Sequence, residues 1–145
     1  MPIKTFRGLI ADGATDTIVL HTNDGSTGYR IVKFQVIQEQ PGAQDTESTV
    51  TINKVPFTPL NTIDLSDNKI LAVSYFSSNA AAEHGLQNST TIIFDQEIFN
   101  QDIYIGSNDL SGKKMNYYIE LEQVKLDLNE NTVATLKDIR NKAVP

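Results

Sequence analysis

Two glutamates near the end of the chain have the spacing that could support acid–base chemistry. Glu120 and Glu122 are two positions apart, so on a β-strand they would share one face, with their carboxylates about 6.5–7 Å apart. That separation is compatible with the paired carboxylates of glycoside hydrolases. Ile119 and Leu121 alternate with them, which is also typical of a strand with one face in solvent. We favour this second interpretation.

The remaining residues with catalytic potential are sparse. The chain has no cysteine and two histidines, His21 and His84, which excludes disulfides, thiolate zinc sites and cysteine nucleophiles. Oxygen-rich turns at 12–16 and 23–26 could in principle hold calcium. Neither turn has the spacing of an EF-hand loop, and Asp, Asn and Gly are also ordinary turn residues. We therefore predict no enzyme, no cofactor and no metal site.

The charge balance excludes some classes of partner. The 145 residues contain 12 Lys and Arg against 18 Asp and Glu, a net charge of −6, and residues 38–110 alone carry −8. An acidic chain is poorly suited to binding nucleic acid, which requires clustered cations. The sequence lacks the ~20 consecutive apolar residues of a membrane-spanning helix. We expect no nucleic-acid or membrane partner.

The apolar residues mostly alternate with polar ones, the pattern of half-buried strands. It predicts one domain over residues 1–145, all-β, an antiparallel β-sandwich of seven to nine strands that is jelly-roll-like. The apolar run Ile92–Phe94 is expected to lie in a central strand. Residues 106–109, Gly-Ser-Asn-Asp, are expected to form a loop. The strand segments are predicted at 16–21, 28–37, 48–54, 69–76, 90–94, 102–105 and 115–128.

The longest of these segments changes phase. Apolar side chains occupy odd positions up to Leu121 and even positions from Val124 onward, so the buried face switches across Glu122–Gln123. One extra residue in a strand has this effect. The sequence therefore predicts a bulge or bend at Glu122–Gln123, where the strand enters a second sheet or leaves the domain to meet a partner.

The C-terminus is the one segment with helical spacing. Val133, Leu136 and Ile139 recur at three-residue intervals after the capping sequence Asn129–Asn131. These residues predict one short C-terminal helix, at about 130–141. A helix this short is marginal alone, so its apolar stripe must dock on the parent sheet or on a neighbouring subunit. We favour the parent sheet.

Three tyrosines near the chain end, Tyr104, Tyr117 and Tyr118, are candidates for a carbohydrate or protein contact, because tyrosine supplies contact area at low entropic cost. The alternative, which we favour, is that they fill the pleat of the sheet.

Four segments resemble a group of small proteins from marine tailed bacteriophages. The C-terminal stretch Tyr118–Asn141 resembles the C-terminal signature of the group, and Ile3–Gly8, Leu20–Phe34 and Ile93–Tyr104 are similar to the same proteins. The resemblance is least from residue 45 to residue 89. It implies a virion structural protein of a podovirus-type phage, made in the host cytoplasm and placed on the capsid surface.

Within that group, the resemblance favours a non-enzymatic capsid decoration or cement protein that stabilises the head at capsomer joints. The major capsid protein would be the partner, and a position on a three-fold axis would make the chain a homotrimer. The alternative is a tail, fibre or baseplate-associated module that contacts host surface glycans. The residues that we expect at interfaces are Lys4 and Arg7 for capsid attachment, and Tyr117, Tyr118, Val133, Leu136 and Ile139 for packing on a neighbour.

Overall fold

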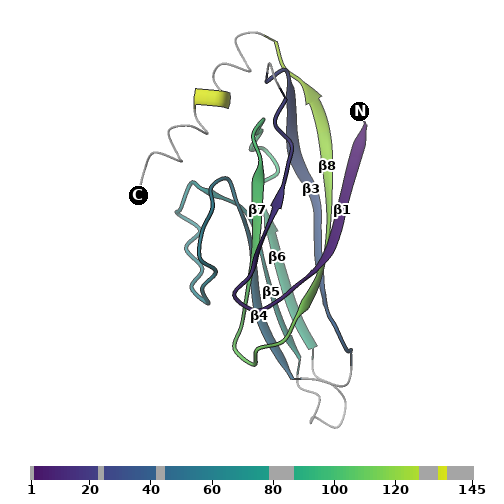
Figure 1. Ribbon diagram of the computed structural model, residues 1–145, viewed down its shortest axis with the longest axis vertical. Helices are drawn as coiled ribbons and strands as arrows, with labels where there is room; N and C mark the ends of the chain where they lie inside the picture. Colours follow the sequence, from purple (N-terminus) through teal and green to yellow (C-terminus); the bar gives the residue numbers. More distant parts are fainter. Residues whose placement is uncertain (1, 23–24, 42–44, 79–86, 128–133, 137–145) are drawn as a thin grey trace.

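A computed structural model of the chain describes residues 2–22, 25–41, 45–78, 87–127 and 134–136. Two antiparallel sheets face each other (Figure 1), which confirms the predicted all-β sandwich. Sheet A has the order β1-β8-β3 and sheet B the order β2-β7-β4-β5-β6. The strands are β1 (Ile3–Ile10), β2 (Thr15–Ile18), β3 (Thr27–Gln38), β4 (Thr46–Asn53), β5 (Ile70–Ser78), β6 (Gln87–Ile93), β7 (Ile103–Asp109) and β8 (Met115–Lys125).

The strand order is that of a jelly roll with one strand displaced. A long antiparallel hairpin of eight strands, wound into two sheets, pairs strand one with eight, two with seven, three with six and four with five. Here the first, second and fourth of these pairs form, whereas β6 pairs with β5. Beside β3, where a sixth strand would lie, there is an isolated bridge between Tyr29 and Phe99.

The hydrophobic core fills the space between the sheets. In β8, Met115, Ile119 and Leu121 are fully buried and alternate with partly exposed residues, as expected for a strand with one face in the core. The central strands of sheet B bury consecutive residues, such as Leu71–Ser74 in β5 and Ile105–Ser107 in β7. The largest fully buried apolar side chains are Ile10, Ile31, Ile52, Leu71, Phe76, Phe99, Ile103, Ile105, Met115, Ile119 and Leu121.

The bulge lies one strand away from its predicted position. The bulge predicted at Glu122–Gln123 is wrong, because β8 keeps an uninterrupted register with β3 across these two residues and stays in sheet A. The shift occurs in β3, between Ile31 and Lys33, where Val32 is the extra residue. A bulge changes the phase of the strand that carries it. β3 accordingly buries Tyr29 and Ile31 before Val32, and Phe34 and Val36 after it, whereas buried Leu126, which suggested a phase change in β8, lies beyond the end of that strand.

Two other strands differ from expectation. The segment Ile92–Phe94 does not lie centrally, because β6 is the edge strand of sheet B. Residues 106–109, expected to be a loop, belong to the central strand β7. Only glycine fits at position 106, because Phe57 and Pro59 lie against the backbone there and a Cβ would come within 2.7 Å of each ring.

The N-terminal strand and the C-terminal helix lie at the same end of the sandwich (Figure 1). Residues 134–136 are helical, and the rest of the helix expected at 130–141, including Val133 and Ile139, lies outside the described residues. Ala134 is buried and Leu136 is 56% exposed. Among the described residues, no helix is both long enough and apolar enough to cross a bilayer.

Candidate functional site

The outer face of sheet A carries two of the expected interface residues, Arg7 and Tyr118. We call it the three-strand face. The register places one side chain from each strand in a row across it: Arg7, Tyr118 and Gln35 form one row. Neighbouring strands are ~4.8 Å apart, so the three side chains of a row lie next to one another. The next rows contain Thr5, Glu120 and Lys33, then Ile3, Glu122 and Arg30.

Tyr118 lies at the centre of this face and is held on both sides. The Lys33 ammonium lies 5.9 Å from the centroid of its ring, within the range of a cation–π contact. Its hydroxyl donates a 2.7 Å hydrogen bond to Glu120 Oε2. That hydrogen bond is the main reason why the pKa of Tyr118 is raised, with smaller contributions from burial and from the Glu120 charge. The ring is therefore presented in a fixed orientation.

The two glutamates considered for catalysis are each committed to a neighbour. Glu120 accepts the Tyr118 hydroxyl, and Glu122 accepts a 3.0 Å hydrogen bond from the Arg30 guanidinium in a partly buried ion pair. They do share one face, as the spacing predicted. Both carboxylates are engaged in contacts that order this surface.

Apolar side chains lie at both ends of the three-strand face. Ile3 is 48% exposed at one end, and Leu9 and Ile37 are 46% and 57% exposed at the other, in the row that contains Asn116. Exposed Arg7 lies between these ends. Aromatic residues and arginine are enriched in protein interfaces, whereas large exposed aliphatic side chains are costly in water. The composition of the face suits contact with another protein.

The other expected interface residues are distributed differently. Lys4 is exposed but on the opposite side of β1, with its ammonium 5.9 Å from the centroid of the Tyr29 ring. Tyr117 is buried, and its hydroxyl donates a 3.0 Å hydrogen bond to Asp16. Burial and this bond raise the pKa of Tyr117 to about 12. Its ring therefore packs within the domain, whereas Leu136 is exposed.

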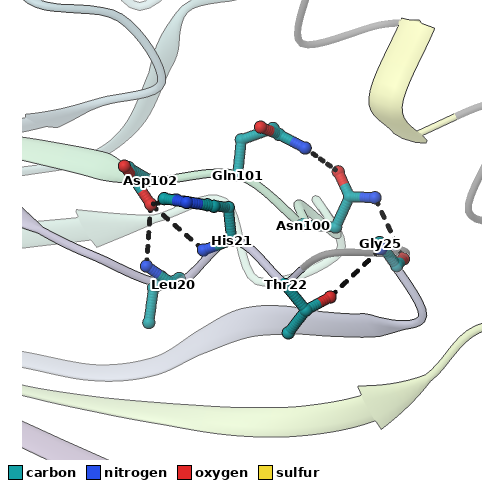
Figure 2. A network of polar contacts seen from close by, with 7 residues as sticks. All are labelled: Leu20, His21, Thr22, Gly25, Asn100, Gln101 and Asp102. Carbon is teal, nitrogen blue, oxygen red and sulfur yellow. Dashed lines mark hydrogen bonds and ion pairs between the residues drawn. The ribbon is translucent and has the colours of Figure 1, made fainter.

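A second polar centre lies near one end of the sandwich and joins distant segments (Figure 2). Asp102 Oδ1 accepts hydrogen bonds from the backbone NH groups of Leu20 and His21, at 2.8 and 3.0 Å, and from His21 Nδ1 at 2.7 Å. Burial alone would raise the pKa of Asp102, but these donors outweigh it and keep the pKa below its usual value. A His–Asp pair orients the base in hydrolase triads; here the same oxygen also anchors the backbone after β2.

Asn100 extends this centre toward the C-terminal helix. It is fully buried, and its Nδ2 donates to the Gly25 carbonyl at 3.1 Å and to Thr135 Oγ1 at 2.8 Å. Figure 2 shows the Asn100 side chain pointing to the turn at Gly25, and Gly25 N in turn donates to Thr22 Oγ1. Residue Thr135 of the helical turn is thus joined to the parent domain by a hydrogen bond, whereas Leu136, the described member of the predicted apolar stripe, is exposed.

The oxygen-rich turn at residues 12–16 is engaged in the fold. Asp12 accepts the backbone NH of Asp109 at 2.8 Å, and Asp16 accepts the Tyr117 hydroxyl. Buried Asp109 accepts hydrogen bonds from the Ser48 hydroxyl and the Ser111 NH. Within the described parts of the chain, no three His, Asp or Glu side chains are grouped so as to hold a metal ion.

Sequence reasoning missed several residues that organise these centres. Lys33 and Gln35 join the three-strand face only through the register of β3 with β8, and Asp102 and Asn100 act on segments about 80 positions away. The only available signal in the sequence was the polar alternation around Lys33.

No family model matches the chain, and no curated protein or solved structure was found to be similar to it.

Proposed function

We propose that the protein is a non-enzymatic structural protein of a phage virion, a decoration or cement protein that attaches to the capsid surface through the three-strand face. The observation that carries the proposal is the composition of that face: an oriented tyrosine, Tyr118, beside an exposed arginine, Arg7, between exposed aliphatic side chains. This combination is typical of protein contacts. The resemblance to phage proteins supplies the virion context.

The fold is compatible with this role. Jelly-roll sandwiches recur in viral capsid proteins and in lectins, although a fold by itself does not establish a function. A cement protein acts through shape and contact area, and the proposal needs no reaction site. The major capsid protein is the proposed partner. A location on a three-fold axis would make the chain a homotrimer, a state that sedimentation of the purified protein measures directly.

The first test is the composition of the virion. We expect the protein to co-purify with mature heads of the phage that encodes it, in a fixed ratio to the major capsid protein, and to lie over capsomer joints in virion images. Its absence from purified virions, or density confined to the tail, would refute the capsid assignment.

A second test addresses the face itself. Replacing an interface tyrosine at the centre of a contact typically costs ~2 kcal/mol or more, about 30-fold in affinity. We expect Tyr118→Ala to weaken binding to capsids stripped of the protein by this factor, and Arg7→Glu to weaken it further. Tyr75→Ala is the matched control, because Tyr75 lies on sheet B with a similar hydrogen bond to Glu47. Equal losses for both tyrosines would contradict the assignment.

The second candidate is a tail, fibre or baseplate-associated module that binds host glycans. It is favoured by the polar surroundings of Tyr118, because sugar rings commonly stack on exposed aromatic side chains that have hydrogen-bonding neighbours. A glycan array probed with the isolated protein and with Tyr118→Ala separates the two functions. Glycan binding that depends on Tyr118, together with a location on the tail, would replace the capsid proposal.

A further inference from the structure

A groove on the other sheet has the shape of a peptide-binding site. It lies between the turn that leads into β5 and the turn that follows β6, and it has a volume of about 480 Å³. Its apolar lining comes from Leu65 and Ile70 on one wall and from Ile93 and Phe94 on the other. Grooves of this volume, with apolar walls and a few polar groups, are common binding sites. We call it the acid-rimmed groove.

The walls of this groove are held by hydrogen bonds within the domain. Phe94 N donates to the Leu71 carbonyl at 3.0 Å, and the backbone NH of Lys69 donates to Asp67 Oδ1 at 2.9 Å. The Arg30 guanidinium, from sheet A, donates to the Asp95 carbonyl at 3.3 Å. A preformed groove binds a ligand with a smaller loss of conformational entropy than a loop that must first become ordered.

The rim of the groove is acidic. Asp67, Asp95 and Glu97 all line it. Buried Lys54 forms an ion pair with Glu97 from inside the domain. Asp95 is exposed and Asp67 is half-buried, and both belong to the segment of the chain that carries most of the negative charge. The charge of the rim therefore complements a cationic ligand.

The loop that forms one wall also exposes further apolar surface. Leu60, Ile63 and Leu65 are 61%, 43% and 46% exposed, on the loop between β4 and β5 that projects on the left of Figure 1. Three large aliphatic side chains on one exposed loop are unusual for a surface that stays in water. Apolar walls, an acidic rim and this loop together select a ligand with both apolar and basic side chains.

We propose that the acid-rimmed groove binds an extended segment of a partner protein in which aliphatic side chains alternate with lysine or arginine. In an extended segment, alternate side chains point to opposite sides, so aliphatic residues would enter the groove while basic ones reach the carboxylates of Asp67 and Asp95. Strand β1, which carries Lys4 and Arg7, is not the occupant of the groove, because it is paired with β8 in sheet A. The inference is independent of the three-strand face.

The test uses a labelled synthetic peptide of nine residues in which leucine alternates with arginine, and a matched peptide with glutamate in place of arginine. Fluorescence anisotropy should show binding of the first peptide only. The double variant Asp67→Asn/Asp95→Asn should bind the arginine peptide about tenfold more weakly, because it loses the two exposed ion pairs with the peptide. The asparagine at position 67 can still accept the turn hydrogen bond, so the wall is preserved.

The control is Glu39→Gln/Glu47→Gln, which changes the net charge equally at the far end of β4. We expect this variant to bind the peptide within about twofold of the parent. Equal weakening in both double variants would show attraction to net charge alone and would overturn the proposal. Unchanged binding in both would also overturn it.

A second variant tests the apolar wall. Leu65→Ser should weaken peptide binding several-fold, and it should fold normally because Leu65 is 46% exposed; a thermal melt checks this. If sedimentation instead shows that the parent protein self-associates and that Leu65→Ser is monomeric, the groove is an interface between copies of the chain, and the proposed occupant is wrong.

Discussion

Replacement of Asn100 is the sharpest test of how the C-terminal helix is held. Asn100 is fully buried and donates hydrogen bonds to the Gly25 carbonyl and to Thr135 Oγ1. In Asn100→Ala both bonds are lost, at a net ~0.5–1.5 kcal/mol each, and a buried carbonyl left without a donor adds ~1–3 kcal/mol. We therefore expect the free energy of unfolding to fall by about 2–6 kcal/mol.

Urea unfolding measures this change, and a companion variant separates its two parts. Thr135→Val keeps the shape of the side chain but removes the oxygen that Asn100 contacts, so it should cost only ~1 kcal/mol. In both variants the amides of residues 134–136 should exchange with solvent faster than in the parent. Asn116→Ala, at an exposed position of β8, should change stability by less than ~0.5 kcal/mol.

Two results would refute this reasoning. If Asn100→Ala unfolds at the same urea concentration as Asn116→Ala, the buried amide does not hold the turn at Gly25. If exchange at residues 134–136 is unchanged in Thr135→Val, the helix is held by contacts other than the hydrogen bond to Asn100.

Three further predictions concern packing and pH. Gly106→Ala should lower stability by about 1–3 kcal/mol in urea unfolding, because the new Cβ would meet Phe57 at 2.7 Å. The lowered pKa of Asp102 means that the unfolded chain takes up a proton first as pH falls, so stability is lost below about pH 5. Urea unfolding between pH 6 and 3 should show a shallower loss for Asp102→Asn. Tyr117→Phe removes the hydrogen bond to Asp16, which should cost ~1 kcal/mol at pH 7. The pKa of Tyr117 is raised to about 12, so its contribution is lost as pH rises from about 10 to 12, and the phenylalanine variant should lose less stability there.

The sequence predicted the fold class because the period-two pattern survives in most strands. β3 and β8 bury alternate residues, and alternation of this kind depends only on neighbouring positions in one strand. The C-terminal helix was also predicted correctly where the structure describes it, at 134–136. The docking of its apolar stripe on the parent sheet stays a prediction, because Leu136 is exposed and Val133 and Ile139 lie outside the described residues.

Features that depend on distant contacts could not be predicted in the same way. The sequence Gly106–Asp109 is typical of a loop, but it forms part of β7. Phe57 and Pro59 cover Gly106, and Asp109 forms hydrogen bonds with Ser48 and Asp12 from other segments. The apolar run Ile92–Phe94 is typical of a central strand, but the side chains of Ile93 and Phe94 line a surface groove. In each case tertiary contacts overrode local preference.

For the candidate site, the side-chain types did not assign each residue to one side of its strand. Tyr117 and Tyr118 are adjacent, so a strand must send one inward and one outward. The structure buries Tyr117 and leaves Tyr118 on the three-strand face. Lys4 and Arg7 are three positions apart in β1 and likewise point to opposite sides. Alternation along a strand places the two residues of each pair on opposite faces, but the residue types alone could not show which residue lies on which face.

The displaced β6 connects the fold to the two proposed contacts. Because β6 pairs with β5 instead of β3, sheet A has only three strands. The same displacement places Ile93 and the following turn beside β5, where they form a wall of the acid-rimmed groove. The free edge of β3 is interrupted by the bulge at Val32 and by the bridge from Phe99, features that discourage pairing with another strand. If both proposed contacts form, the chain links two neighbours through side chains of its two sheets, as the proposed location at a capsomer joint requires.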